Sequence, residues 1–212
     1  MEYDALEQSG EHYNPGEPTT PRQAASVILL RGGGEGMEIL LVKRNPAAHF
    51  MGGAWVFPGG ALDRDEPVGE DDSAHRAAAL RELEEEASVS LAGPEQLVPF
   101  SRWITPAEVK TRFDTHFFLA PAPDDADPQP DGAETVDSGW FSPRSALDAH
   151  RGGEIMLVFP TIKHLEQLAR FDTANELLGY ARGRKVEPVQ PKVLVSGETA
   201  RIVLPGEPGY QA

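Results

Sequence analysis

Hydrophobic residues along this chain recur with two different spacings, which predict strands in some segments and helices in others. An apolar, β-branched run at 24–31 is followed by a glycine-rich turn and a second such run at 37–44, a pattern typical of a β-hairpin. The runs 192–195 and 200–204 are expected to pair as another hairpin. Further strand-like runs occur at 55–57, 97–104, 112–120 and 134–142.

Three segments carry the features of helices. Segment 74–87 is rich in strong helix formers and follows Asp72 and Ser73, either of which is a suitable N-cap. Segment 143–151 opens with a proline, and 161–182 has the spacing of one long amphipathic helix. Strands that flank a central helix, with another helix near the end, predict an α+β fold arranged as an α/β/α sandwich. The apolar face of the first helix consists of Ala79, Leu80, Leu83 and Ala87.

The two ends of the chain differ in composition from its middle. Residues 1–22 are polar and rich in Pro, Glu and Thr, which predicts a loose N-terminal arm. A single domain is expected over 23–204, followed by a tail at 205–212, because no internal repeat or long linker divides the stretch. No apolar run approaches the ~20 residues of a membrane-spanning helix, and the acidic N-terminus does not resemble a secretory signal.

Charge and cysteine content narrow the function classes. Hydrophobic residues make up 40% of the chain and charged residues 25%, as in ordinary globular proteins. The formal net charge of −15 disfavours binding to nucleic acid or anionic lipid, so we expect a small-molecule substrate and neither a nucleic-acid nor a membrane partner. The absence of cysteine excludes disulfides and thiolate catalysis and accords with the cytoplasmic location that we expect.

Carboxylates cluster on the first predicted helix. Glu82 and Glu86 are four residues apart and Glu82 and Glu85 three apart, so the three side chains project from neighbouring turns. Like charges at this spacing oppose helix formation, which makes sense if cations neutralise them, and oxygen ligands of this kind suit Mg²⁺ or Mn²⁺. A solvated acidic face is the alternative interpretation of these three carboxylates.

Arg81 also has two interpretations. It would either orient one of the carboxylates or form a surface ion pair with Glu85.

Other familiar catalytic patterns are missing. The histidines show no ligand spacing, which argues against a zinc site, and no serine stands in a G-x-S-x-G setting. The glycine-rich 32–36 lacks the Lys-Ser/Thr of a phosphate loop, so a hairpin turn explains it better.

The segment from the Phe57–Gly60 motif FPGG to the carboxylate helix resembles the box of the Nudix hydrolases, G-x5-E-x7-R-E-U-x-E-E-x-G-U, where U is aliphatic. Residues 81–89 match its second half except at Ser88, which replaces a glycine. The first half is longer than the pattern by seven residues, because Gly60 lies 21 residues before Arg81 rather than 14. The upstream glutamate of the box is therefore unassigned, with Asp63, Glu66, Glu70 and Asp72 as candidates.

This resemblance implies a Nudix-type fold, with a mixed β-sheet between helices, and an Mg²⁺- or Mn²⁺-dependent diphosphatase. Glu85 and Glu86 would be the principal metal ligands, with a backbone carbonyl at Gly59 or Gly60. Glu82 would bind a further metal or position the attacking water. A distal carboxylate would serve as ligand or general base, with Glu134 preferred to Asp137. Arg81 would hold a glutamate in place.

The resemblance extends to a branch of the family that contains coenzyme A diphosphatases, carried by 40–65, 112–120 and the WFSP element at 140–143. It implies coenzyme A or an acyl-CoA-like ester as substrate. Nucleotide sugars and dinucleotides stay open, as does a non-catalytic module that senses a metabolite, which Ser88 and the unassigned glutamate would support. A homodimer is compatible with the family, although no segment indicates an interface. Candidate substrate-binding residues are Lys43, Arg44, Phe50 and Arg112.

Overall fold

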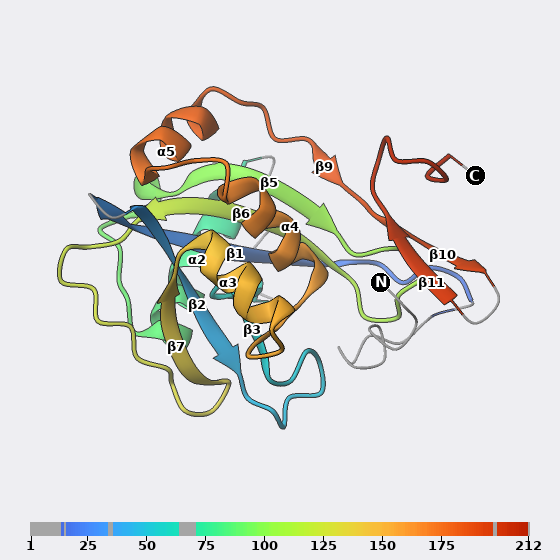
Figure 1. Cartoon of the computed structure of the whole chain (residues 1–212), viewed down its shortest axis with the longest axis horizontal. Helices are drawn as coiled ribbons and strands as arrows, with labels where there is room; N and C mark the ends of the chain where they lie inside the picture. The colour runs from blue at the N-terminus through green and yellow to red at the C-terminus, as the bar shows by residue number, and fades with distance from the viewer. Residues whose placement is uncertain (1–13, 15, 34–35, 64–70, 197–198, 212) are drawn as a thin grey trace.

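A computed structural model describes residues 14, 16–33, 36–63, 71–196 and 199–211, and Figure 1 shows their arrangement. A mixed sheet forms the centre of the molecule, and a separate hairpin lies beside it. The α-helices are α2 (Ser73–Ala87), α3 (Pro143–Arg151), α4 (Phe159–Leu168) and α5 (Ala174–Arg182). The strands of the sheet are β1 (Arg22–Gly33), β2 (Gly36–Arg44), β3 (Ala54–Val56), β4 (Gly59–Ala61), β5 (Val98–Ile104), β6 (Phe113–Pro121), β7 (Thr135–Phe141), β8 (Met156–Leu157) and β9 (Pro188–Val189).

The sheet contains both antiparallel and parallel pairs. Strands β1 and β2 form the predicted hairpin, with Leu30 opposite Ile39, and β1 runs parallel to β6 on its other side. The order along the sheet is β8-β3-β2-β1-β6-β5-β9, with β7 added to β2 and β4 added to β1. The short strand β4 was not predicted; its glycines pair with Ala25 and Ser26 of β1.

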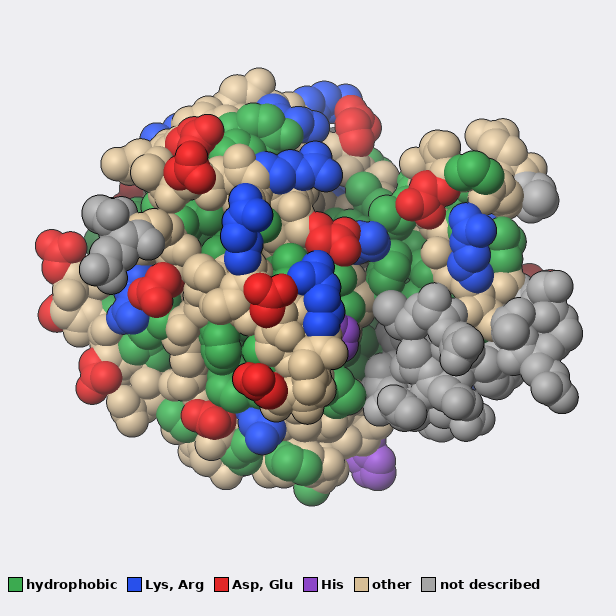
Figure 2. All heavy atoms as spheres, in the orientation of Figure 1, with side chains coloured by type: hydrophobic (Ala, Val, Ile, Leu, Met, Phe, Trp, Pro, Cys, Tyr) green, Lys and Arg blue, Asp and Glu red, His purple; other side chains and the backbone are tan. Residues whose placement is uncertain are grey.

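Helices cover both faces of the sheet, which confirms the predicted α/β/α sandwich. Side chains alternate between the faces along each strand, so β1 sends Val27 and Leu29 to one side and Ile28 and Leu30 to the other. The first face packs against α2, and the second packs against α3, α4 and α5. Figure 1 shows α3 and α4 lying across the sheet on the viewer's side. On that face, acidic and basic side chains are interspersed, as Figure 2 shows.

The N-cap of α2 is at one of the two predicted residues, and the two ends of the helix are held by different contacts. Asp72 is the N-cap residue, but its side chain does not cap the helix; instead the Asp71 carboxylate accepts hydrogen bonds from the amide and hydroxyl of Ser73. At the other end Ser88 adopts a left-handed conformation, with φ of 55°, and its amide donates to the Glu84 carbonyl. Glycine is the usual residue at such a position, so the departure from the box pattern at Ser88 concerns how the helix ends.

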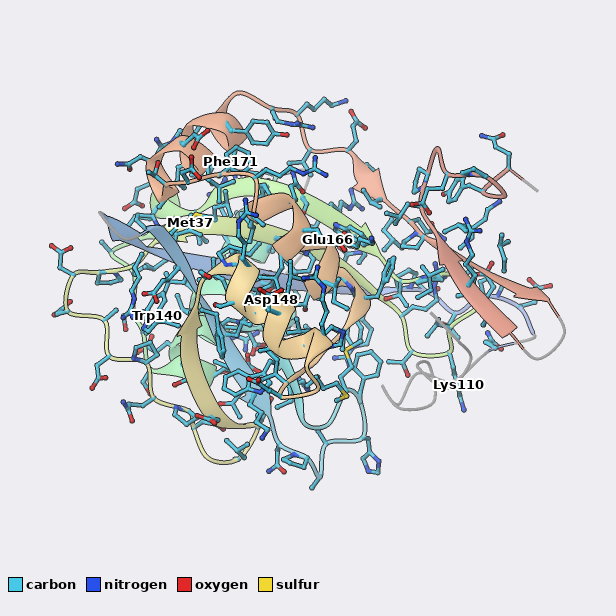
Figure 3. The ribbon with its side chains drawn as sticks, viewed as in Figure 1. Met37, Lys110, Trp140, Asp148, Glu166 and Phe171 are labelled. Atoms are coloured by element: carbon cyan, nitrogen blue, oxygen red, sulfur yellow. The ribbon has the colours of Figure 1, made fainter. Side chains whose placement is uncertain are left out.

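The prediction of one helix over 161–182 is wrong. Helix α4 begins earlier, at Phe159, and ends at Leu168, and α5 begins at Ala174. Thr173 is extended and its side chain accepts a hydrogen bond from the Glu176 amide, which starts a new helix. The turn between the helices brings Phe171 into the core that contains Met37, and Figure 3 shows both at one end of the sheet. None of the described helices is both long and apolar enough to cross a membrane.

The predicted C-terminal hairpin is confirmed as β10 (Lys192–Ser196) and β11 (Thr199–Val203), which pair with each other and not with the main sheet. Its apolar side packs on the loop between β5 and β6, where Val109, Val193 and Ala200 form a small buried cluster. The flanking segments contact the same region. The Thr19 hydroxyl donates to the Lys110 carbonyl at 2.9 Å, and the Tyr210 hydroxyl donates to the Gln190 carbonyl at 2.8 Å.

Helix α4 carries a buried histidine on the side that packs against the sheet. His164 is 1% exposed, its Nε2 lies 2.6 Å from the Ser101 hydroxyl, and the Phe117 ring centre is 4.3 Å from its own. Burial lowers the pKa of His164 from 6.5 to about 4. The unfolded chain therefore takes up a proton near pH 6.5 that folded His164 takes up only near pH 4, so the fold loses stability as the pH falls through this window.

We predict that His164→Gln, which keeps a hydrogen-bonding group for Ser101, reduces this pH dependence. The stability of the wild type should fall relative to that of the variant by on the order of 3 kcal/mol between pH 7.5 and pH 4. Urea denaturation at a series of pH values measures the difference, in which contributions of other titrating groups cancel. Parallel stability profiles for the two proteins would contradict the assignment.

Candidate active site on helix α2

The side of α2 that faces the sheet contains two glutamates. Buried residues recur along α2 at the spacing of a core-facing stripe, and within this stripe Glu82 is 9% exposed and Glu86 3% exposed. Ala79, Leu83 and Ala87, which were predicted to form the apolar face, lie in the same stripe with no exposure. Carboxylates almost never occupy such positions without a partner, so the contacts of these two decide what the site can do.

Glu86 lies beneath the short strand β4. Its Oε2 accepts a hydrogen bond from the Gly59 amide at 2.9 Å, and its Oε1 lies 3.9 Å from Nη1 of Arg44. Burial raises the pKa of Glu86 from 4.5 to about 7, and the charges of Glu82 and Glu134 add to the increase against the opposing effects of Gly59 and Arg44. Ionising this carboxyl therefore costs about 3 kcal/mol more than in water, which a bound cation would offset.

Arg81 orients Glu82 as the sequence predicted. Its Nη1 donates to Glu82 Oε1 at 2.8 Å and to Glu85 Oε2 at 3.1 Å, while Nη2 donates to the Ala61 carbonyl at 3.1 Å. One guanidinium thus makes both of the contacts that were considered as alternatives, one to the buried and one to the exposed carboxylate. Burial still raises the pKa of Glu82, with Glu85 and Glu134 adding to the effect, although Arg81 opposes it.

Gly60 of β4 leaves room for the Glu82 carboxylate, and Gly59 allows β4 to lie close to β1. A Cβ on Gly60 would lie 2.3 Å from Oε1 of Glu82, and a Cβ on Gly59 would lie 2.5 Å from the Ala25 carbonyl oxygen. Both distances are far below contact distance, so no other residue fits at either position without movement. Gly59 is therefore required by the close approach of β4 to the backbone of β1, whereas a side chain at Gly60 would displace the Glu82 carboxylate.

A loop before β7 brings Glu134 to the same place. The Asp131 carboxylate accepts hydrogen bonds from the amides of Glu134 and Thr135, and the Thr135 hydroxyl donates to the Glu86 carbonyl at 2.8 Å. The Asn45 amide fixes the loop from the other side by donating to the Glu134 carbonyl at 2.8 Å. Asp137, the second choice, lies opposite Lys43 in the β2–β7 register and is exposed.

Five carboxylates consequently surround one hollow. Its lining consists of Glu82, Glu85, Glu86, Asp131 and Glu134. Arg81 and Arg44 are the cations that contact this group among the described residues, so several negative charges stay uncompensated. Hard oxygen ligands in this number fit Mg²⁺ or Mn²⁺. Asp131 was not predicted, although an Asp-Gly pair just before a strand is a recognisable turn signal.

The hollow adjoins a larger cavity of about 500 Å³ that Glu82, Glu86 and Glu134 also line. Two predicted substrate-binding residues, Arg44 and Phe50, belong to its lining. The other two, Lys43 and Arg112, are not among the described lining residues.

The structure explains why Lys43 and Arg112 do not line the cavity. Lys43 follows Met37, Ile39 and Leu41 at two-residue spacing and so points to the face of the sheet away from α2. Arg112 is 8% exposed, and its guanidinium donates to the carbonyls of Thr19 and Thr105, so it fixes the N-terminal segment to the β5–β6 loop.

The candidates for the upstream glutamate separate into three groups. Asp63 lies 3.5 Å from Nε of Arg81, at the edge of the carboxylate group. Asp72 is at the opposite end of α2, where its carboxylate lies 3.2 Å from Nδ1 of His116. Glu66 and Glu70 fall outside the described residues.

Asp72 belongs to a second polar group, which includes His75 and His116. Potential ligand atoms of these three residues lie within 4.8 Å of one another, a proximity that their sequence spacing did not indicate. The two imidazole rings are stacked, 3.8 Å apart and 17° from parallel, and His75 Nε2 lies 3.0 Å from Gln23 Oε1. Because a metal binds in the plane of an imidazole, face-to-face rings must rotate before one ion can bind both.

In the arrangement observed, Asp72, His75 and His116 attach the start of α2 to the sheet. Gln23 Nε2 also lies 3.4 Å from Asp114, whose carboxylate forms a two-pronged ion pair with Arg102 at 2.6 and 2.8 Å. The arrangement lies roughly 16 Å along the helix from Glu86 and is distinct from the carboxylate hollow.

Comparison with known proteins identifies relatives of this arrangement. The NUDIX domain family model matches residues 20–158, which include every residue that lines the hollow. The chain is 25% identical over 304 residues to the human acyl-coenzyme A diphosphatase NUDT19, covering 91% of this chain and 81% of that protein. It is 26% identical over 224 residues to the putative nudix hydrolase 7 of Caenorhabditis elegans, covering 89% and 74%. The crystal structure of a NUDIX hydrolase from Alicyclobacillus acidocaldarius matches with a TM-score of 0.68 and 27% identity, covering 76% of this chain and 96% of that one.

We predict that Gly60→Ala displaces the Glu82 carboxylate, because the added methyl group would overlap it. Stability should fall by about 1–3 kcal/mol and Mn²⁺ should bind on the order of tenfold more weakly. Thermal denaturation and calorimetric titration measure the two effects.

Gly179→Ala is the matched control, because nothing lies within 4 Å of the added carbon in the exposed part of α5. It should leave Mn²⁺ binding unchanged and raise stability by up to about 1 kcal/mol. Equal behaviour of the two variants would show that β4 does not constrain Glu82.

Proposed function

The chain belongs to the NUDIX family and is a hydrolase of acid anhydrides, and from this premise we propose that it cleaves a diphosphate linkage with a divalent cation held on α2. The proposed substrate is coenzyme A or one of its acyl esters. Hydrolysis of the diphosphate would yield an adenosine bisphosphate and a phosphopantetheine half, the latter carrying any acyl group.

One observation carries the metal dependence: Glu82 and Glu86 are buried in the core-facing stripe of α2 and share a hollow with three further acids. A stripe that served packing alone would be apolar at these positions. Mg²⁺ or Mn²⁺ would be held by Glu82, Glu85 and Glu86, with a carbonyl of the Gly59–Gly60 segment as a further candidate ligand. When bound, such a cation supplies Lewis-acid stabilisation of phosphoryl oxygens and lowers the pKa of a bound water.

The remaining side chains act on position, charge and protons. Arg81 holds Glu82 and Glu85 in fixed directions through its three hydrogen bonds. Arg44 places a positive charge at the junction of hollow and cavity, where a phosphate of the substrate would lie. Glu134 lines both spaces and is held by its backbone on two sides, so we assign it the role of accepting a proton from the attacking water.

Two observations support the substrate class. The cavity beside the hollow is lined largely by apolar side chains, which suits a substrate with a long organic part on one side of its diphosphate. A relative that covers most of this chain is itself an acyl-coenzyme A diphosphatase. The alternative of a non-catalytic sensor rested partly on the departure at Ser88. That support is weakened, because Ser88 ends α2 in the left-handed conformation that a glycine would also adopt.

A panel of diphosphates tests the proposal. With Mg²⁺ or Mn²⁺ present, we expect cleavage of coenzyme A and octanoyl-CoA with higher kcat/KM than of ADP-ribose, UDP-glucose or diadenosine tetraphosphate, measured by chromatography of the products. Glu86→Gln and Glu85→Gln should each lower kcat/KM by about 100-fold or more, because each removes a charged metal ligand.

The control is Glu84→Gln, on the same helix but exposed and outside the hollow, which should change kcat/KM less than twofold. Tight binding of a panel member without turnover would overturn the enzymatic assignment. Full activity in Glu86→Gln with unchanged metal dependence would overturn the ligand assignment.

A separate prediction concerns the proton acceptor. Glu134→Gln keeps the shape of the side chain but removes its basicity, so kcat should fall by roughly 100-fold while KM stays within a few-fold. Asp137→Asn is the control, since this acid is only three residues further along the chain, on β7, but lies outside the hollow. If steady-state kinetics show the two variants to be equally active, the base must be another residue.

A further inference from the structure

The cavity beside the hollow has two chemically different halves. Near α2 it is bounded by Arg44, Gly60, Glu82, Glu86 and Glu134. The opposite half is mainly apolar and is formed by the end of β5, the first half of β6 and the start of α4. Its aromatic lining consists of Phe50, Trp103, Phe113, Phe117 and Phe159.

Part of the apolar half is built by the C-terminal hairpin. Pro191, Val193 and Ile202 line the cavity together with Val109 of the β5–β6 loop. The hairpin lies after residue 158, where the matched NUDIX domain ends, and it pairs with no strand of the main sheet. Figure 1 shows it to one side of the sheet, and Figure 3 shows Lys110 on the adjoining loop.

Several contacts fix the hairpin in this position. The Val193 amide lies 3.3 Å from Glu108 Oε2, and Val193 is 5% exposed in a cluster with Val109. Lys192 Nζ donates to the Tyr210 carbonyl at 2.7 Å, so the tail after the hairpin is attached to it. The hairpin is thus a packed wall of the cavity.

The charges along the cavity indicate which end of a substrate each half takes. Arg22 and Arg44 are the basic residues of the described lining, and Arg44 adjoins the carboxylates. Arg22 has its guanidinium 5.8 Å from the Phe113 ring centre. A nucleotide end that carries a further phosphate would need more cations than the apolar half offers. A hydrocarbon chain needs none and gains from leaving water.

We propose that the C-terminal hairpin forms the wall of an acyl subsite, in which Ile202 and Val193 contact the acyl chain of a coenzyme A thioester. The inference rests on the proposed diphosphatase function and adds to it a preference for acyl esters over free coenzyme A. Each methylene that becomes buried in the subsite contributes up to about fourfold in kcat/KM.

The test uses the full-length protein with Mg²⁺ and compares coenzyme A with acetyl-, butanoyl-, hexanoyl- and octanoyl-CoA. In the wild type, kcat/KM should rise with chain length, chiefly through a lower KM. Ile202→Ser should reduce the ratio of octanoyl-CoA to coenzyme A kcat/KM about tenfold and leave coenzyme A within twofold. Arg201→Ser, an exposed neighbour on the same strand, is the matched control and should keep the wild-type ratio.

The outcomes separate the two proposals. If the wild type hydrolyses free coenzyme A and the four esters with the same kcat/KM, the acyl subsite is overturned while the diphosphatase function stands. This measurement needs no variant. An equal loss for coenzyme A and octanoyl-CoA in a folded Ile202→Ser also overturns it, because the hairpin then contacts the shared part of the substrate. Cleavage of none of these compounds overturns the diphosphatase function, and the subsite with it.

Discussion

The structure depends on the burial of two carboxylates in a helix face that must also pack against a sheet. Alanine and leucine fill most of this face on α2, and Glu82 and Glu86 occupy two of its positions. A buried carboxylate without compensation is costly, as the pKa of Glu86 near 7 indicates. The surrounding residues compensate the two carboxylates only in part. The Gly59 amide of β4 donates to Glu86 and Arg81 donates to Glu82, whereas the charge of Glu134 raises both pKa values, so a bound cation would offset the remainder.

This constraint explains features that otherwise look unrelated. The glycines of β4 allow a backbone to lie against the Glu82 carboxylate, and the turn at Asp131 holds Glu134 at the same hollow. Arg81, partly buried, is shared between Glu82 and Glu85. The site is therefore assembled by three segments, each of which is fixed by its own backbone hydrogen bonds, so the carboxylates can be held in place before any ligand arrives.

Periodicity predicted most of the fold, because the hairpins and the central helix follow from local spacing alone. It failed at 161–182, where the capping by Thr173 starts a second helix although the apolar spacing continues. In the site, Glu82, Glu86 and Gly60 were predicted from the motif, and Arg44 as a candidate for substrate binding. The pairing of His75 with His116, the role of Arg112 in fixing the N-terminal segment and the hairpin wall were not, since each depends on residues brought together by the tertiary fold.

The central claim is that the buried carboxylates of α2 hold a divalent cation, and anomalous diffraction from crystals soaked in Mn²⁺ tests it most directly. The account predicts a Mn²⁺ peak within coordination distance of Glu82, Glu85 or Glu86 in the wild type and its loss in a Glu82→Gln/Glu86→Gln variant. A hollow that stays empty at saturating Mn²⁺ would contradict the claim. So would a peak confined to Asp72, His75 and His116, because that group lies at the other end of the helix.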